Sequence, residues 1–215
     1  MATKQGISCI LCGSETKAFR IARKRRYYQC THCFSVLMDP KDYVTSEQEK
    51  ARYETHNNDV NDPGYQQFVS PIVKQILHHH TPGEQGLDFG AGTGPVITKL
   101  LRDQSFYIRT YDPFFDADHS CLENTYHYIV CCEVAEHFHR PAAEFRKLRN
   151  LLKSGGRIYC MTELYASGID FDNWNYKNDE THVIIYHKRA LEWIRKNIGF
   201  TNLEIYNNRL FILEI

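Results

Sequence analysis

Eight residues decide the fold of this chain: Leu87-Asp88-Phe89-Gly90-Ala91-Gly92-Thr93-Gly94. The apolar start is typical of a buried strand, and the glycines permit a tight turn into a helix expected at 95–101. In dinucleotide sites the third glycine follows the second by three residues, but here it follows by two. Asp88 would also repel a pyrophosphate at the strand end. The loop therefore favours a cofactor with an amino group and a sulfonium but no phosphate, and S-adenosylmethionine (SAM) fits.

Short apolar runs alternate with helical stretches on the carboxyl side of this loop, which indicates an α/β fold with a Rossmann-like sheet. We expect strands at 106–111, 126–132 and 157–161, helices at 141–152 and 188–197, and a closing hairpin at 203–215. Upstream, apolar residues repeat at helical spacing over 65–80. Asp112 ends one strand, where its carboxylate can accept hydrogen bonds from ribose hydroxyls.

Four motifs in order resemble those of class I SAM-dependent methyltransferases: LDFGAGTG at 87–94, YD at 111–112, VCCEVAEHF at 130–138 and LKSGGRI at 152–158. The resemblance covers about residues 85–215. It is greatest to the compact branch related to the ubiquinone-biosynthesis O-methyltransferases. It implies that the cofactor is bound by Asp88, Gly90, Ala91, Gly92, Asp112 and Glu133.

Two features depart from that family pattern. Only residues 113–125 separate Asp112 from the next strand, too few for the usual helix–strand–helix. We therefore expect one strand of the sheet to be missing or vestigial, and we assign no adenine contact. His127 stands where the family often has Asp, so the role of that acid is not carried over.

Four of the eight cysteines form two CxxC pairs, with 17 residues between Cys12 and Cys30. This spacing predicts a structural Zn²⁺ site with four thiolate ligands in a β-ribbon over residues 1–40, folded with energy supplied by the metal. Disulfides or redox CxxC motifs are the alternatives. Disulfides fit poorly with a cytosolic chain. The predicted ligands are Cys9, Cys12, Cys30 and Cys33.

The zero net charge of the chain hides an asymmetry between its two parts. Residues 1–40 hold seven Lys/Arg and two Asp/Glu, whereas residues 41–215 hold 19 and 24. Residues 20–28, between the CxxC pairs, contain five cations and two tyrosines, and such a hairpin can grip phosphates and stack on bases. It can equally dock on the acidic remainder of its own chain. The residues concerned are Arg20, Arg23, Lys24, Arg25, Arg26, Tyr27 and Tyr28.

A second metal site is suggested where the methyl group should point. Offsets of three and four place Glu133, Glu136 and His137 on one face if this segment is helical. Together with the distant His182 they resemble the E-x-x-E-H motif and distal His of small-RNA 3′-terminal 2′-O-methyltransferases, whose four side chains hold a divalent metal. That resemblance implies Mn²⁺, Co²⁺ or Zn²⁺ here.

Such a metal would bind vicinal hydroxyls and lower the pKa of one of them. The metal-free alternative makes His182 the general base, with Asp179 to orient it and Glu133 near the substrate. In either case Trp174 and Tyr176 can stack on a planar substrate or simply belong to the core.

These observations predict an enzyme of the SAM-dependent methyltransferase class (EC 2.1.1), acting on an oxygen of an unidentified acceptor. The alternatives are an RNA methyltransferase guided by the basic ribbon, and an inactive adaptor that binds nucleic acid or protein. We divide the chain into a ribbon (1–40), a helical connector or lid (41–80) and a methyltransferase domain (81–215).

The sequence also limits where the protein acts. No apolar run approaches the roughly 18 residues that a membrane span needs, and residues 1–6 contain no apolar signal-peptide core. We therefore expect a cytoplasmic protein without a membrane partner. Whether the acceptor is a small molecule or RNA, and how many copies of the chain associate, stays open at this point.

Overall fold

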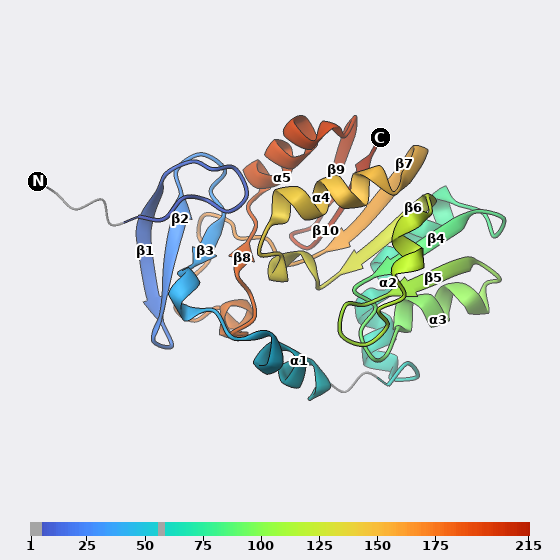
Figure 1. Ribbon diagram of the computed structural model, residues 1–215, viewed down its shortest axis with the longest axis horizontal. Coiled ribbons are helices and arrows are strands. Elements are labelled where there is room, and N and C mark those ends of the chain that lie inside the picture. The colour runs from blue at the N-terminus through green and yellow to red at the C-terminus, as the bar shows by residue number, and fades with distance from the viewer. Residues whose placement is uncertain (1–5, 56–58) are drawn as a thin grey trace, which may run out of the picture.

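The computed structural model of the protein describes residues 6–55 and 59–215 (Figure 1). The expectation about a leader peptide falls largely on residues outside this part. The chain forms a six-stranded sheet covered by helices and a smaller four-stranded sheet beside it. No helix in the described residues has the length and apolar character needed to cross a membrane.

The large sheet has the strand order β5-β4-β6-β7-β10-β9. Its first four strands are parallel, and β10 runs antiparallel to both β7 and β9. Within the described residues nothing pairs with the outer edge of β5, which confirms the expected missing strand. The strands are β4 (Gln85–Phe89), β5 (Tyr107–Tyr111), β6 (Tyr126–Cys132), β7 (Leu152–Met161), β9 (Asn202–Tyr206) and β10 (Leu210–Glu214).

Helices cover both faces of this sheet because successive side chains of its buried strands point to opposite sides. Tyr128 and Val130 of β6 join the core under α2 (Pro63–His79) and α3 (Val96–Asp103). Ile129 and Cys131 face α4 (Pro141–Asn150) and α5 (Lys188–Ile194) on the other side. The expected α/β class is confirmed.

Two predicted boundaries differ from the structure. The helix expected to reach Leu152 ends at Asn150, and β7 already begins at Leu152, since Leu152 pairs with Tyr126 across a β-bulge. The helix expected to reach Asn197 ends at Ile194. A π-turn (Arg195–Gly199) continues it and stops at Gly199, whose φ of 93° suits glycine.

The small sheet has the order β1-β2-β3-β8. Its ribbon strands are β1 (Thr16–Ala22), β2 (Arg25–Cys30) and β3 (Val36–Met38). The fourth strand, β8 (Ile184–Ile185), comes from the far end of the sequence and pairs with Val36 and Leu37 of β3. Sequence reasoning did not foresee this pairing, which joins the ribbon core to the methyltransferase core.

The connector predicted for residues 41–80 holds two helices with different surroundings. Helix α1 (Ser46–Glu54) begins with a capping box, in which the Thr45 hydroxyl accepts from the Gln48 amide. Figure 1 shows α1 between the two sheets. Helix α2 instead packs on the large sheet through Val69, Ile72, Val73 and Ile76. The domain borders at residues 40 and 80 remain a prediction.

Short 3₁₀ turns complete the described chain and shape the edge of the large sheet where the parallel strands end. They are η1 (Pro40–Asp42), η2 (His119–Glu123), η3 (Ala135–His137) and η4 (Asn175–Asn178). Two of them, η3 and η4, carry side chains that lie at the site described next.

Candidate functional site

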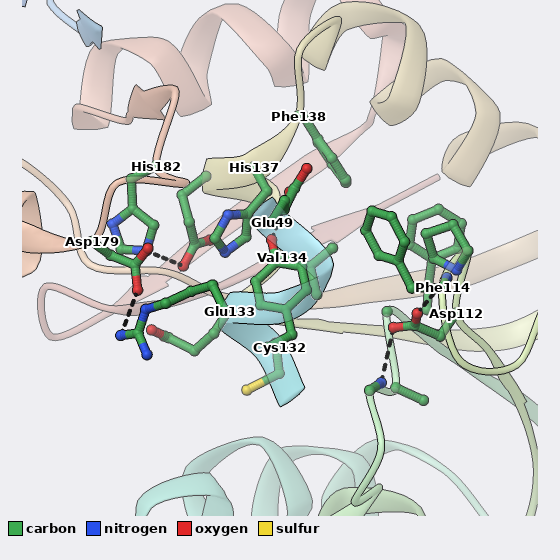
Figure 2. Close-up of a pocket in the computed structure, with 18 of the residues that line it drawn as sticks. Glu49, Asp112, Phe114, Cys132, Glu133, Val134, His137, Phe138, Asp179 and His182 are labelled. Atoms are coloured by element: carbon green, nitrogen blue, oxygen red, sulfur yellow. Dashed lines mark hydrogen bonds and ion pairs between the residues drawn. The ribbon is translucent and has the colours of Figure 1, made fainter. Parts of the chain in front are cut away.

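A cavity of about 1310 Å³ lies at the carboxyl ends of β4, β5 and β6, where ligands bind in open α/β sheets. Figure 2 shows two groups of side chains along it. Asp112 and Phe114 lie at one end, and His137, Asp179 and His182 lie at the other. We call these the cofactor end and the acceptor end.

The glycine-rich loop and Asp112 build the cofactor end. Gly90 and Gly92 have positive φ angles of 80° and 62°. A Cβ on Gly90 would lie 2.4 Å from Val134 Cγ2, so the loop admits no side chain there. The Asp112 carboxylate accepts hydrogen bonds from the amides of Gly92 (3.0 Å), Phe114 (2.8 Å) and Phe115 (3.1 Å). Asp112 therefore ties the loop to the turn after β5.

Phe114 and Phe115 line the cavity and were missed by the sequence analysis. The signal was present in the sequence, because two aromatic residues follow Asp112-Pro113 directly. They give the cofactor end an apolar surface suited to a flat heterocycle.

Asp88 does not line this cavity. Its carboxylate is 4% exposed on β4 and accepts a hydrogen bond from the Thr98 hydroxyl at 2.8 Å. Burial raises the pKa of Asp88 to about 6. Direct contact of Asp88 with an amino group of the cofactor therefore stays a prediction, whereas Gly90, Ala91, Gly92, Asp112 and Glu133 all line the cavity.

The acceptor end contains a close group of Glu136, His137 and His182, which we call the triad. One ligand atom from each lies within 4.8 Å of the others. The Nδ1 atom of His137 lies 3.1 Å from the Thr181 carbonyl, and that of His182 lies 2.9 Å from the Tyr176 carbonyl. Since a carbonyl only accepts, each Nδ1 donates a hydrogen bond to it, and Nε2 is the ring nitrogen that remains available to a ligand.

Glu136 supplies the negative charge of the triad and is fully buried. Its Oε1 accepts from the Tyr176 hydroxyl and lies 3.9 Å from His182 Nε2. Its Oε2 is buried and has no hydrogen-bond partner among the described residues. An orphaned carboxylate oxygen beside two imidazole lone pairs is a donor set that suits a divalent cation.

Glu133 was predicted as a fourth ligand, but the structure does not bring it into the triad. The prediction assumed a helix, whereas Glu133 leaves β6 with a φ of 52° and only Ala135–His137 form a 3₁₀ turn. The side chain instead lies 3.5 Å from Arg209. Burial, reinforced by repulsion from Glu136, raises the pKa of Glu133 to about 9.

Asp179 was predicted to orient His182, but the Tyr176 carbonyl occupies the orienting position. Asp179 accepts from the Thr181 amide and hydroxyl and pairs with Arg52 at 3.0 Å. Burial opposes ionisation, yet the Thr181 hydrogen bonds prevail and lower the pKa of Asp179 to about 2. Asp179 thus ties helix α1 to the acceptor end.

Helix α1 contacts both ends of the cavity through Tyr53. The Tyr53 ring packs edge-on against His137, with centroids 5.4 Å apart, and lies 6.0 Å from the ring of Phe114. Glu49 and Arg52 also line the cavity. From α2, Tyr65 and Phe68 add an apolar wall. These α1 and α2 residues were not predicted individually.

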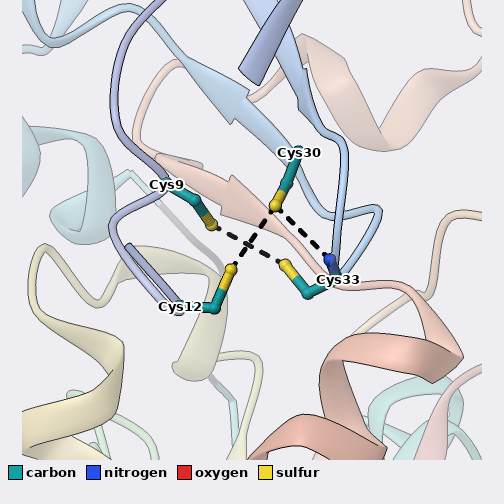
Figure 3. Close-up of side chains that lie close together, drawn as sticks. All are labelled: Cys9, Cys12, Cys30 and Cys33. Carbon is teal, nitrogen blue, oxygen red and sulfur yellow. Dashed lines mark hydrogen bonds between the residues drawn. The ribbon is translucent and has the colours of Figure 1, made fainter. Parts of the chain in front are cut away.

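The four predicted zinc ligands meet at one point of the ribbon (Figure 3). The Sγ atoms of Cys9 and Cys33 lie 3.7 Å apart, and those of Cys12 and Cys30 lie 3.4 Å apart. A tetrahedron with Zn–S bonds of about 2.3 Å has edges of about 3.8 Å. The cysteines are free thiols in the structure, and the amides of His32 and Cys33 donate to Cys30 Sγ. The arrangement fits zinc.

Three of the five hairpin cations are engaged by the chain itself. Arg25 Nη2 donates to the carbonyls of Lys177 and Asn178, at 3.4 and 3.1 Å. Arg26 lies 3.4 Å from Asp39 and 3.5 Å from Asp42, and Arg20 lies 3.9 Å from Asp172. The ribbon thus docks on its own chain, which was one of the two interpretations of its charge.

Solved structures with the same fold are methyltransferases. A 1,6-didemethyltoxoflavin-N1-methyltransferase from Burkholderia thailandensis, solved with S-adenosylhomocysteine, aligns with a TM-score of 0.57 at 11% identity, over 92% of this chain and 97% of that one. A SAM-dependent methyltransferase from Archaeoglobus fulgidus aligns with a TM-score of 0.54 at 12% identity, over 80% and 100%. These likenesses confirm the predicted fold.

An O-methyltransferase family protein from Burkholderia thailandensis aligns with a TM-score of 0.55 at 9% identity, over 77% of this chain but only 62% of its own length. The alignment therefore spans less than two thirds of that neighbour's length. No curated protein sequence matches this chain. Residues 63–205, about two thirds of the sequence, match the family described as "Methyltransferase domain". The chain belongs to this family of methyltransferase domains.

Proposed function

We propose that the protein is a SAM-dependent O-methyltransferase of the compact, ubiquinone-O-methyltransferase-like branch, acting on a small molecule with adjacent hydroxyl groups. One observation carries the proposal. The triad of Glu136, His137 and His182 opens into the same cavity as the glycine-rich loop. Groups that can deprotonate a hydroxyl therefore share a chamber with groups suited to a methyl donor.

The cofactor end fits SAM. The close approach of Gly90 to Val134 leaves a smooth backbone cradle, and Asp112 presents a carboxylate to the same space. The residues that would hold SAM are Gly90, Ala91, Gly92 and Asp112, with Phe114 and Phe115 against the adenine. When bound, SAM supplies an electrophilic methyl group on a sulfonium.

The triad fits a divalent metal such as Mn²⁺, Co²⁺ or Zn²⁺. Glu136, His137 and His182 would hold it, and the metal would supply Lewis acidity that lowers the pKa of an acceptor hydroxyl. The Tyr176 and Thr181 carbonyls fix both imidazoles with Nε2 toward the cavity. Tyr176 also holds Glu136 through its hydroxyl, so one residue positions two of the three ligands.

The metal-free alternative makes His182 the general base, and the same geometry disfavours it. Burial, the largest effect, lowers the pKa of His182 to about 4. At neutral pH its imidazole is therefore uncharged but a weaker base than an ordinary histidine. An uncharged imidazole with a fixed lone pair suits metal ligation better than unaided proton abstraction.

We propose that the four cysteines bind a structural Zn²⁺ and that the ribbon supports the acceptor end rather than recruiting RNA. The support for this is the engagement of Arg20, Arg25 and Arg26 by the same chain. A ribbon built for RNA would leave those charges free for phosphates. An inactive adaptor is disfavoured because the buried triad has no purpose in a protein that only binds a partner's surface.

The test follows labelled methyl groups from SAM. Wild type is incubated with Mn²⁺ and a panel of catechols and other vicinal diols, with a ribose-terminated RNA as the competing acceptor. We expect the label on a small-molecule oxygen. His182→Ala should reduce transfer at least about 100-fold and abolish Mn²⁺ binding measured by electron paramagnetic resonance. The SAM Kd should change less than about threefold.

The matched control is His78→Ala, which removes an exposed histidine of α2 that does not line the cavity. It should leave transfer and Mn²⁺ binding unchanged. Label found on a nitrogen, or equal activity in the two variants, would refute the proposal.

A further inference from the structure

Lys177 lies in η4, beside the acceptor end, and is buried without an ion pair to any of the described residues. Lys177 is only 5% exposed. The Nζ atom donates to the Trp174 carbonyl at 3.2 Å and to Asn178 Oδ1 at 3.3 Å, both of them neutral acceptors. Within the described residues no carboxylate lies within ion-pair distance of it. Lysine is almost never buried unless it is paired. Asp170 interacts electrostatically with Lys177 but forms no ion pair with it, so no close counter-ion balances the ammonium group.

A second cation, Arg25, contacts η4 and also forms no ion pair with the described residues. Arg25 donates from Nη2 to the backbone carbonyls of Lys177 and Asn178. Its Nε and Nη1 atoms are buried and have no hydrogen-bond partner among the described residues. Two positive charges therefore lie against η4, and neither forms an ion pair with a carboxylate in the described part of the chain.

The hairpin tip adds a third cation in a strained conformation. Arg23 and Lys24 form the two-residue turn between Ala22 and Arg25, with φ angles of 48° and 67°. Such turns favour Asn and Gly, and other residues pay about 1–2 kcal/mol each. Strain of this kind persists where the conformation serves a function. Here it carries Arg23 to the mouth of the acceptor end, whose lining includes Arg23.

A second cavity, of about 390 Å³, lies between this tip and η4. Figure 1 shows the tip of the β1–β2 hairpin beside the orange segment that precedes β8. Arg23 and Lys177 line the second cavity, and it shares Arg23, Asn175 and Asn178 with the main cavity. Its remaining lining residues are Ile21, Ala22, Asp172 and Asn173, and the carboxylate of Asp172 faces Arg20 at 3.9 Å.

We propose that this second cavity binds an anionic group, a phosphate or a carboxylate, carried by the methyl acceptor. Two cationic residues, Arg23 and Lys177, and three asparagines line it, and such side chains recognise oxyanions. The assignment of the ligand to the acceptor rests on the proposed function. The acceptor would then lie with its hydroxyls at the triad and its anionic group between Arg23 and Lys177.

The observations favour a small acceptor over a nucleic acid. The second cavity has room for one such group and a short connection, whereas RNA needs a row of free cations along its backbone. The hairpin offers no such row, since Arg20, Arg25 and Arg26 are held by their own chain. Arg23 is the hairpin cation that lines the second cavity, where it can contact one anionic group.

The test measures binding of inorganic phosphate and of acetate to the full chain by calorimetry, without added divalent metal. We expect saturable binding to wild type. Arg23→Gln and Lys177→Met should each raise the phosphate Kd at least tenfold. Lys17→Gln is the matched control, because it removes a cation of β1, the strand that leads to the Arg23 turn, and Lys17 does not line the cavity. It should change the Kd less than twofold.

Two further measurements separate this inference from its alternatives. Lys177→Met should melt no lower than wild type without phosphate, since it removes an uncompensated buried charge, and phosphate should no longer raise its Tm. His182→Ala should bind phosphate normally, so loss of transfer and loss of the anion site are distinguishable. The tighter of phosphate and acetate identifies the anionic group.

The inference is overturned if neither anion binds wild type, if Lys17→Gln weakens binding as much as Arg23→Gln, or if Lys177→Met unfolds more readily. It is also overturned if a short single-stranded RNA displaces phosphate from Arg23 at a far lower concentration. That last result would restore the nucleic-acid interpretation of the ribbon.

Discussion

The two ends of the cavity are built in different ways. The cofactor end comes from two short stretches, the loop after β4 and the turn after β5, on adjacent parallel strands. The acceptor end is assembled from the ribbon tip, α1, η3 and the segment around η4, which are distant in sequence. The first can form wherever the sheet forms. The second depends on the ribbon, because the ribbon holds η4 and β8 in place.

The contacts show how directly the ribbon supports the acceptor end. Arg25 and Tyr27 of β2 both donate to the Lys177 carbonyl, and the Met38 amide donates to the carbonyl of Val183. Val183 follows His182, and its own amide donates to the Glu136 carbonyl. Damage to the ribbon should therefore reach the triad while leaving the glycine-rich loop intact.

The largest expected effect comes from Cys30→Ser. One zinc ligand is lost, and structural zinc supplies much of the folding energy of such a ribbon. We expect zinc content to fall and unfolding to become easier by more than about 3 kcal/mol, which lowers Tm by at least about 6 °C. Methyl transfer should fall at least about 100-fold, whereas the SAM Kd of the folded protein should change less than about threefold.

Cys121→Ser is the control for this change, because Cys121 is buried outside the four-cysteine cluster and its Sγ donates to the Thr110 carbonyl, a bond a hydroxyl can replace. Zinc content should stay at the wild-type value. If Cys30→Ser weakened SAM binding as much as transfer, the two ends would not be separable as we describe.

The next effect comes from Gly90→Ala, which attacks the cofactor end alone. The methyl group would meet Val134 at 2.4 Å and hold a left-handed backbone, at a cost of about 1–3 kcal/mol. We expect the SAM Kd to rise at least about tenfold while Mn²⁺ binding at the triad is retained. Gly83→Ala, where a Cβ meets nothing within 4 Å, should leave both unchanged. Equal effects of the two changes on SAM binding would contradict the role of Gly90.

The smallest expected effect concerns Asp88 beneath the loop, in the protein without cofactor. Because burial raises its folded pKa to about 6 from 3.8, its contribution to stability is fully present below pH 3.8 and is lost as pH rises through 6. Asp88→Asn removes this loss. Relative to wild type, the variant should gain about 2 kcal/mol of unfolding free energy between pH 4 and pH 8, measured by urea unfolding. If the unfolding free energies of wild type and Asp88→Asn changed with pH in parallel, burial of the Asp88 carboxylate would not destabilise the folded protein.

Much of the cofactor end was predictable because its signals are local. The spacing of Gly90 and Gly92, Asp112 at the next strand end, and the short connection to β6 each report on neighbours in sequence. The family match and the strand order confirm the fold and the missing strand. Phe114 and Phe115 were overlooked although their signal was equally local.

The acceptor end was predictable only in part, since its geometry depends on pairings between distant segments. The two-residue strand β8 has no sequence signature of its own and exists because β3 offers an edge. The left-handed turn at Glu133, which removes it from the triad, replaced the helix that its spacing had suggested. Lys177 and Arg25 are placed against each other by the docking of the ribbon on η4, and no local sequence pattern encodes this docking.

The pairing of β3 with β8 has a consequence for how the chain is made. Residues 36–38 are synthesised well before their partner Ile184–Ile185, which lies far downstream in the sequence. Until then β3 presents an open backbone edge, the feature that promotes strand pairing between different molecules. A ribbon that binds zinc early would hold this edge in a folded unit while it waits, so metal supply during translation should influence how much protein is recovered soluble.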